Sequence, residues 1–377
     1  MRVLVLADDL TGASDTVVQF AHSGWSSLLS LSGGWREEPT EDAVALTLDT
    51  RRDPQAERIT ARATADLATG AVYLKIDSTV RGRVAEQVRG ALTGVRRRRP
   101  AAYAVVCPAY PALGRTVVDG VVLVDGTPVH EGAAGRDPVT PVTESDLTRL
   151  LPGSVRIPAT DGPVSGLEAA LREAGTSHDV VVVDARDDAD VERLAAAVAA
   201  IGPDALPVGS AGLAGALARA WSEGTHRAGA PTTPPVPTGR ALVVVSSLHE
   251  VARAQARALG ETAEAGTVDV LLTPDRPEHG AAETRAHDIA AQASAILDRG
   301  EHDLLVLVGG DGAAATLNVL GAAGIRVADA PVEGVPLGTI VGGRHDGLAV
   351  ATKAGGFGDP TTLIRLFTAV RALGAPS

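Results

Sequence analysis

The sequence predicts an α/β fold with two domains, each a mostly parallel sheet flanked by helices. Short runs of β-branched residues alternate with alanine- and arginine-rich stretches along the chain, which is the pattern of repeated strand–helix units. With 377 residues, the chain is also long for a single hydrophobic core. A proline-rich segment, APTTPPVPTG at 230–239, interrupts the pattern.

The predicted strands of the first half are short apolar runs. They are RVLVLA at 2–7, AVALTLD at 43–49, AVYLKI at 71–76, YAVVC at 103–107 and VVVVD at 180–184. Amphipathic segments lie between them, such as ADVERLAAAVAAIG at 189–202, with apolar residues at helical spacing. Further strands are expected in ALVVVSS at 241–247 and DLLVLVGG at 303–310.

The proline-rich segment is the expected domain boundary. Its four prolines are incompatible with a regular helix and favour an extended, semi-rigid connector. We therefore expect a larger domain at 1–229, a linker at 230–239 and a smaller domain at 240–377.

Composition excludes several classes of function. A net charge of −12 would repel a phosphate backbone, and 2% aromatic residues leave few side chains on which bases could stack, so we expect no nucleic-acid partner. No apolar run approaches the roughly 18 residues of a membrane-spanning helix. The chain opens directly on a strand without a signal peptide, so a cytoplasmic location is expected. The single cysteine, Cys107, is expected to be a buried structural thiol.

An acidic pair, Asp8 and Asp9, directly follows the first strand. Residues just beyond the carboxyl ends of parallel strands are placed to bind ligands. Adjacent carboxylates repel each other unless water, a cation or a ligand compensates. Capping of the next helix explains one acid but not both, so we expect the pair to belong to an active site.

The segment LKIDSTVRG places Lys75 and Asp77 at the end of another strand, with Ser78 and Arg81 in the polar turn that follows. Hydroxyls, an arginine and free backbone N–H groups at a helix start form a natural anion site. Capping by Asp77 or Ser78 plus a surface salt bridge explains the same residues equally well.

A third polar loop follows the strand that ends at Cys107. Pro108 and Pro111 brace this loop, which presents Gly114 and Arg115. A lone Gly-Arg pair is weak evidence. Three strands of one domain that each end in a polar loop are stronger evidence, because such strand ends converge in space.

The second domain contains glycine-rich turns of the general form that binds phosphates. The candidate ligand-binding residues of these turns and of the loop beside them are Ser247, Gly309, Gly310, Asp311, Gly312, Lys353, Gly355 and Gly356. The GGDG turn is not a Walker A sequence, and a tight strand-to-helix turn is the simpler explanation of it. His249 is more typical of a capping or surface residue than of a catalyst.

Together these segments resemble the four-carbon acid sugar kinase family, whose members phosphorylate threonate, erythronate-type and 3-oxo-tetronate substrates. The similarity covers nearly the whole chain. It rests on LADDLTGASD, LKIDSTVRG, CPAYPALGRTVVDG, EGAAGRDPVTPVTESDL, GSAGLAGALA, VGGDGAAATL, EGVPLG and KAGGFG, in the family's order.

The resemblance implies that the N-terminal domain binds the acid sugar, the C-terminal domain binds ATP, and the active site lies in the inter-domain cleft. It implies Mg²⁺ as a cofactor, with Asp8 or Asp9 as general base and as a partner of the ion. Arg81 and Arg115 would hold the substrate carboxylate, and Lys75 or Lys353 would neutralise the transferring phosphoryl group. Whether the chain forms a homodimer is left open.

Three positions depart from the family's pattern. Gly312 stands where the family has a threonine, which removes a hydroxyl from the nucleotide turn. The family's Gly-Ser-Cys-Ser motif corresponds to Ser246 through His249, of which Ser247 alone is retained. Asp119 stands where a glycine is common. Altered nucleotide affinity and substrate preference are the expected consequences.

Three other functions remain as alternatives. A phosphatase of the haloacid dehalogenase type also opens with a strand that ends in aspartates, but it uses Asp-x-Asp spacing. A kinase of the NAD or diacylglycerol type carries GGDG in its N-terminal domain rather than at Gly309. The third is a sensor that binds an acid sugar without turnover.

Overall fold

The computed structural model describes residues 3–31, 39–137, 139–222, 232–262, 266–274 and 282–373. The chain divides into two compact units, Met1–Ser23 with Thr40–Gly229 and Gly24–Pro39 with Ala230–Ser377. Residues 24–39 thus belong to the second unit, which the sequence pattern did not predict. The expected boundary at 229 lies outside the described residues, and 232–238 form neither helix nor strand.

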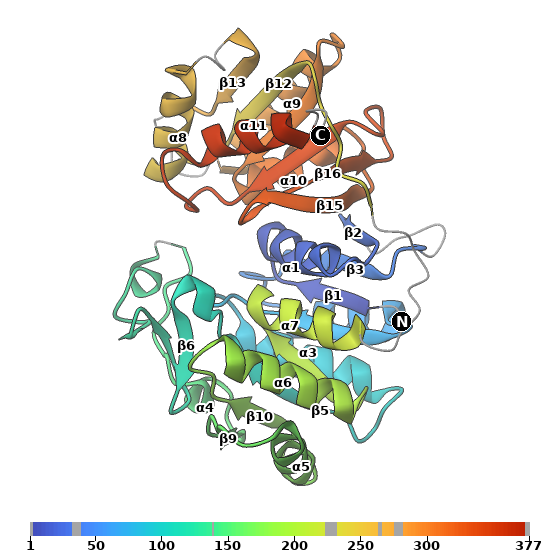
Figure 1. Ribbon diagram of the computed structural model, residues 1–377, viewed down its shortest axis with the longest axis vertical. Coiled ribbons are helices and arrows are strands. Elements are labelled where there is room, and N and C mark those ends of the chain that lie inside the picture. The colour runs from blue at the N-terminus through green and yellow to red at the C-terminus, as the bar shows by residue number, and fades with distance from the viewer. Residues whose placement is uncertain are drawn as a thin grey trace. The chain divides into compact units, whose positions relative to one another are not determined.

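The first unit contains a parallel sheet (Figure 1). Its strand order is β3-β1-β4-β11-β5-β10-β9. Its strands are β1 (Val3–Ala7), β3 (Ala43–Thr47), β4 (Ala71–Lys75), β5 (Tyr103–Cys107), β9 (Val155–Ile157), β10 (Val180–Val183) and β11 (Ala205–Gly209). β1 is buried along its whole length because helices cover both faces of the sheet, so its sequence is continuously apolar. Cys107 is fully buried, and burial raises its pKa to about 12, as expected of a structural thiol.

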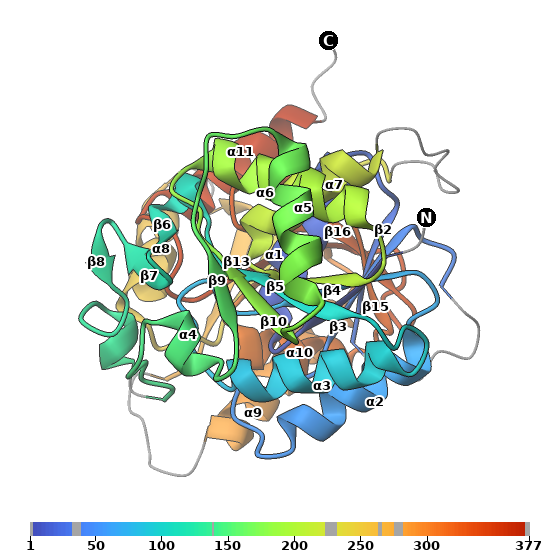
Figure 2. The same ribbon diagram turned by 90° about the horizontal axis from the view of Figure 1, so that it is seen from below.

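The helices of this unit form two layers. They are α1 (Leu10–His22), α2 (Ala56–Leu67), α3 (Val84–Arg96), α5 (Val164–Gly175), α6 (Asp188–Ile201) and α7 (Ala211–Ser222). Figure 2 shows α2 and α3 together on one face of the sheet and α1, α5, α6 and α7 on the other. The rings of Phe20 on α1 and Trp221 on α7 stack with centroids 6.3 Å apart.

A small antiparallel sheet lies apart from the main sheet, and the sequence analysis did not predict it. Its strands are β6 (Arg115–Val118), β7 (Val121–Val124) and β8 (Thr127–Pro128). Short helical turns flank it: η1 (Pro111–Leu113), η2 (Ala134–Arg136) and α4 (Leu147–Leu150). Because η1 leads directly into β6, the loop after β5 is held in a defined position.

The second unit has a mixed sheet with the order β13-β12-β14-β17-β16-β15-β2. Its strands are β2 (Ser27–Ser30), β12 (Arg240–Val245), β13 (Val268–Leu272), β14 (His302–Val308), β15 (Gly324–Val332), β16 (Val335–Val341) and β17 (Ala349–Lys353). β13, β12, β14 and β17 pair in parallel, whereas β17, β16, β15 and β2 pair antiparallel. The parallel part therefore contains the strands whose ends were expected to bind a nucleotide.

Four helices pack on this sheet: α8 (Glu250–Gly260), α9 (Ala282–Leu297), α10 (Gly310–Val319) and α11 (Thr362–Leu373). Alternate strand residues such as Val243 and Val306 join Leu366 of α11 in one buried cluster. α9 and α10 pack against each other. Within the described ranges no helix is long and apolar enough to cross a bilayer.

Candidate active site

The first candidate site lies at the carboxyl ends of three adjacent strands, β3, β1 and β4. These strands are parallel and in register, with Ala7 opposite both Thr47 and Lys75. The loops that follow them therefore leave the sheet at one edge. Arg51 follows β3, the acidic pair follows β1, and Asp77 follows β4.

Asp8 is buried in an ion pair with Arg51. The Arg51 Nε donates to Asp8 Oδ2 at 2.7 Å, and Nη2 donates to Oδ1 at 3.2 Å. Asp8 is 2% exposed. Burial raises the pKa of its carboxyl, and the positive charge of Arg51 opposes that rise. Both oxygens of this carboxylate are thus engaged by one guanidinium.

Asp9 caps α1, which is the structural explanation considered for one member of the pair. The Gly12 N–H donates to Asp9 Oδ1 at 2.7 Å. Asp9 Oδ2 lies 2.9 Å from Arg51 Nη1. One arginine therefore pairs with both acids, and the general-base role expected for Asp8 or Asp9 stays a prediction.

Asp77 organises the turn after β4. Its carboxylate accepts hydrogen bonds from the Thr79 backbone N–H at 2.9 Å and from Arg81 Nη2 at 2.7 Å. Although burial alone would raise the pKa of Asp77, Arg81 and Arg51 hold it well below its usual range. Asp77 does not cap α3, whose N-cap is Arg83. Arg81 also donates to Asp137 at 3.2 Å, so its guanidinium is held from two sides.

Lys75 and Arg115 are cations of this cluster for which no ion pair with an acid is found among the described residues. Lys75 is 6% exposed, and its Nζ lies 2.9 Å from the position that a Cβ on Gly12 would occupy. Arg115 donates from Nη1 to Ser78 Oγ at 2.8 Å, and its buried Nε has no hydrogen-bond partner in the described residues. Gly114 ends η1 directly before β6 and so brings Arg115 to this place.

Sequence reasoning missed two residues of this cluster. Arg51 follows the strand at 43–49 in the same way that Asp8 follows the first strand, so its position after a strand was an available signal. Asp15 lies in the second turn of α1, one turn beyond Gly12 on the same face. Burial raises the pKa of Asp15 to about 7; the positive charge of Lys75 opposes that rise, and the negative charge of Asp9 adds to it.

The second candidate site is formed around the GGDG turn in the other unit. Gly309 has φ +111°, which favours glycine, and its N–H donates to the Lys353 carbonyl at 2.9 Å. Gly310 and the exposed Asp311 begin α10. A Cβ on Gly312 would overlap the side chain of Ser246. Because residue 312 has no side chain, the side chain of Ser246 can occupy this space.

The glycine-rich segment after β17 lies against the loop after β12. A Cβ on Gly355 would overlap Ser247, and one on Gly356 would lie 3.1 Å from His249 Nε2. His249 caps α8, as its ring Nδ1 accepts from the Val251 N–H at 3.2 Å. Lys353 is 3% exposed, and burial lowers its pKa to about 8. The structure thus brings the expected nucleotide-binding residues together.

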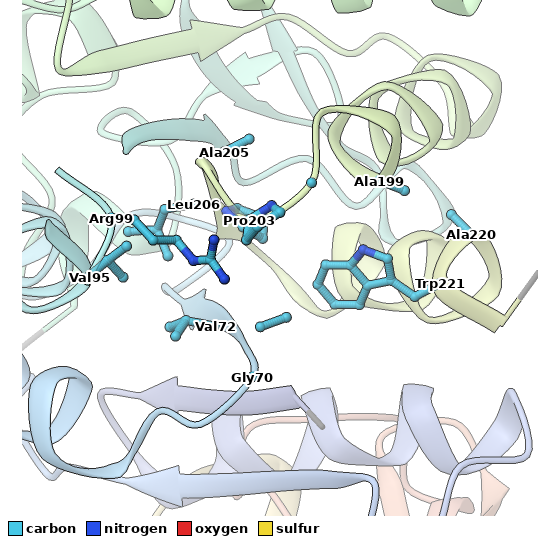
Figure 3. A pocket seen from close by; sticks show the side chains of 13 residues that line it. Gly70, Val72, Val95, Arg99, Ala199, Pro203, Ala205, Leu206, Ala220 and Trp221 are labelled. Atoms are coloured by element: carbon cyan, nitrogen blue, oxygen red, sulfur yellow. The ribbon is translucent and has the colours of Figure 1, made fainter. Parts of the chain in front are cut away.

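A separate cavity of about 260 Å³ lies at the opposite end of the first unit's sheet. Figure 3 shows Val72, Leu206, Arg99 and Trp221 around it. Val72 and Leu206 lie near the amino-terminal ends of β4 and β11. The residues predicted for substrate or nucleotide lie at the carboxyl ends of strands, and none of them lines this cavity.

Family models match both parts of the chain. A model described as a sugar-binding N-terminal domain matches residues 3–217, more than half of the chain. A model described as a nucleotide-binding C-terminal domain matches residues 280–363.

Curated relatives match most of the chain, and one of them matches almost its full length. A D-threonate kinase of Bordetella bronchiseptica is 40% identical, with 97% of each chain covered. A 3-oxo-tetronate kinase of Brucella melitensis is 28% identical, with 72% of this chain and 65% of the relative covered.

Solved structures show the same fold. A protein from Bordetella bronchiseptica, described as a domain-swapped dimer with bound citrate, is 37% identical, with a TM-score of 0.54 and 98% and 99% of the two chains covered. A Haemophilus influenzae protein is 22% identical, with a TM-score of 0.76 and the same coverage. The second likeness confirms the predicted two-domain α/β fold.

Proposed function

This chain belongs to the four-carbon acid sugar kinase family, and on that premise we propose that it transfers the γ-phosphoryl group of ATP to a hydroxyl of such a sugar acid. It is a phosphotransferase that acts on an alcohol group. Threonate, erythronate and 3-oxo-tetronate are the proposed acceptors. D-threonate is the first to test because the relative at 40% identity carries that name.

The observation that carries the acceptor assignment is the buried Arg115 Nε, which has no hydrogen-bond partner in the described residues. Arg51 and Arg81 form ion pairs with acids, whereas the buried Nε of Arg115 has no hydrogen-bond partner and Lys75 forms no ion pair among the described residues. A buried donor without a partner is costly, and a substrate carboxylate would satisfy it. We therefore assign the acceptor's carboxylate to Arg115 and Lys75, while Arg81 holds the turn that carries Ser78.

The ATP assignment rests on the second unit. First-turn N–H groups of a helix have no intrahelical partner, and they bind phosphate oxygens where glycines allow close approach. The turn from Gly309 to Gly312 begins α10 in this way. The Lys353 backbone carbonyl accepts the Gly309 N–H, and the buried Lys353 Nζ donates to the Ala354 carbonyl at 2.6 Å. A phosphate anion would stabilise the charged form of this lysine.

Mg²⁺ belongs to the proposal because it neutralises charge on the transferring phosphates. In the parts of the chain that the structure describes, no group of three or more His, Cys, Asp or Glu side chains is arranged to hold a metal. Asp8, Asp9 and Asp77 are paired with arginines. The ion is therefore proposed to enter bound to the ATP phosphates.

The decisive experiment measures ADP release from ATP and Mg²⁺ across a panel of tetronates. ADP should form only when an accepted sugar acid is present, and Arg115→Ala should raise KM for the acid about tenfold or more. Arg62→Ala is the matched control, because Arg62 is 80% exposed and pairs on the surface with Asp66. Binding of a tetronate without ADP release would support a sensor. Phosphate release from sugar phosphates without ATP would support a phosphatase.

Assembly is a separate part of the proposal. The relative described as a domain-swapped dimer supports a homodimer. Light scattering on the purified chain distinguishes a monomer from a dimer directly.

A further inference from the structure

The carboxylates around the first site differ in whether an oxygen remains available. Asp8 gives both oxygens to Arg51. Asp9 gives one to the Gly12 N–H and the other to Arg51. Asp77 gives one to Thr79 and Arg81 and the other to Arg81. A carboxylate whose oxygens are all engaged by protein donors is poorly placed to accept the proton of a substrate hydroxyl.

Asp15 is the exception in this cluster. Across the described ranges no hydrogen bond or ion pair engages its side chain, although Lys75 and Arg115 are close enough to act on it electrostatically. The residue is half-buried rather than fully enclosed, so a ligand can reach it. Its oxygens are thus available to a substrate hydroxyl in a way that those of the three paired acids are not.

The position of Asp15 on α1 fits contact with the same ligand as Lys75. Gly12 and Asp15 are three residues apart and lie on one face of the helix. The Lys75 Nζ occupies the space that a side chain on Gly12 would fill. Asp15 therefore lies one helical turn beyond the position at which the Lys75 ammonium contacts α1. That ammonium is proposed to hold the substrate's carboxylate.

The charges that act on Asp15 come from several elements. Lys75 at the end of β4 and Arg115 on β6 favour its ionised form, whereas Asp9 and Asp77 oppose it. Burial is the largest effect, and it raises the pKa of Asp15 to about 7. A general base works best when its pKa lies near the operating pH.

We infer that Asp15 is the general base that activates the acceptor hydroxyl, an inference that rests on the proposed kinase function. Asp15 takes the proton of the substrate hydroxyl as its oxygen forms a bond to the γ-phosphorus of ATP. The bond between that phosphorus and the β–γ bridging oxygen breaks, and its electron pair leaves with ADP. In this assignment Arg51 holds Asp8 and Asp9 as fixed parts of the site, and neither acid takes up the proton.

The test compares wild type, Asp15→Asn and Asp9→Asn in steady-state ADP formation with an accepted tetronate from pH 5.5 to 9. Wild-type kcat/KM should fall about tenfold per pH unit on the acid side of the Asp15 pKa, because the protonated carboxyl cannot accept the hydroxyl proton. Asp15→Asn should lower kcat by about 10²–10⁴-fold, with KM changed less than about threefold. It should also lose the fall of kcat/KM toward low pH, which we call the acid limb of the profile. Asp9→Asn should keep that limb.

A second variant separates a chemical role from a structural one. Added formate should restore turnover of Asp15→Ala in proportion to its concentration, because the small carboxylate can replace the missing base. A folded Asp15→Asn with kcat within about threefold of wild type, or with the acid limb intact, would overturn the inference. So would a wild-type profile without an acid limb, even if neither variant folds. Wild type inactive on every tetronate refutes the proposed function and the base role together.

Discussion

Arg51 lies across the carboxylate of Asp8, with Nε and Nη2 donating to its two oxygens at 2.7 and 3.2 Å. The two residues are 43 positions apart, and their pairing joins the carboxyl ends of β3 and β1. The same guanidinium also contacts Asp9 at 2.9 Å and Asp77 at 3.5 Å. Arg51 is therefore the cation around which the acidic side of the first site is arranged.

Removing this cation should destabilise the protein. Arg51→Ala leaves buried acids without a partner and should lower the free energy of unfolding by about 3 kcal/mol, measured by urea denaturation at pH 7. Adding Asp8→Asn should recover part of the loss, since it removes the unpaired charge. Arg62→Ala on the exposed face of α2 is the control, with a change under about 0.5 kcal/mol. Equal losses in the two single variants would contradict the assignment.

The close approach of Lys75 to Gly12 predicts a selective loss of acceptor binding. A Cβ at position 12 would lie 2.8 Å from Asp9 Oδ1 and 2.9 Å from Lys75 Nζ, so Gly12→Ala must displace one of them. KM for the sugar acid should rise about tenfold while KM for ATP stays unchanged. Gly260→Ala is the matched control because no atom lies within 4 Å of its Cβ position. If KM for the sugar acid is unchanged in Gly12→Ala, the proposal that Lys75 binds the acid beside Gly12 is wrong.

The shared space of Gly312 and Ser246 predicts a rescue. Gly312→Ala should raise KM for ATP about tenfold without changing KM for the acid, because its Cβ would overlap Ser246. Adding Ser246→Gly removes the overlap and should restore most of the nucleotide affinity. If the double variant binds ATP as weakly as Gly312→Ala, the clash is not the cause.

Lys353 predicts how nucleotide binding depends on pH. Burial lowers its pKa to about 8, so in the free protein the ammonium loses its proton as the pH rises through that value. Calorimetric titration with ATP should therefore show weaker binding at pH 9 than at pH 7. Lys353→Arg keeps its charge across this range, so its affinity should change much less between the two conditions. Parallel pH dependence in both proteins would exclude Lys353 as the titrating group.

The burial of Asp15 predicts a stability change of opposite sign to its effect on activity. Its folded-state pKa of about 7 lies above the roughly 3.9 of an exposed aspartate, so ionisation destabilises the native state as the pH rises from 4 through 7. Asp15→Asn cannot ionise and should raise the thermal midpoint by a few degrees at pH 8, with a smaller gain at pH 5. Asp66→Asn on the surface of α2 should show neither change, and a gain that grows toward low pH would contradict the sign.

The strand–helix alternation by itself determined the fold class and the strand ends. Continuous apolar runs such as 103–107 form buried parallel strands because both faces of the sheet are covered. The positions of Asp8, Asp77 and Gly309 directly after strands followed from the same pattern. These features are readable because burial imposes a local period on the sequence.

Only the tertiary structure shows which charged side chains of the first site remain available to a ligand. The pairing of Arg51 with Asp8 depends on strand order and register, and the approach of Arg115 to Ser78 depends on the small sheet that begins at β6. Residues 24–39 join the second unit through β2, although they lie within the first unit's sequence. A hydrophobic pattern indicates whether a residue is buried. It does not indicate which distant residue pairs with a buried charged side chain. For that reason the sequence identified the acidic pair, while the structure shows that Arg51 engages both acids and that no residue it describes pairs with Asp15.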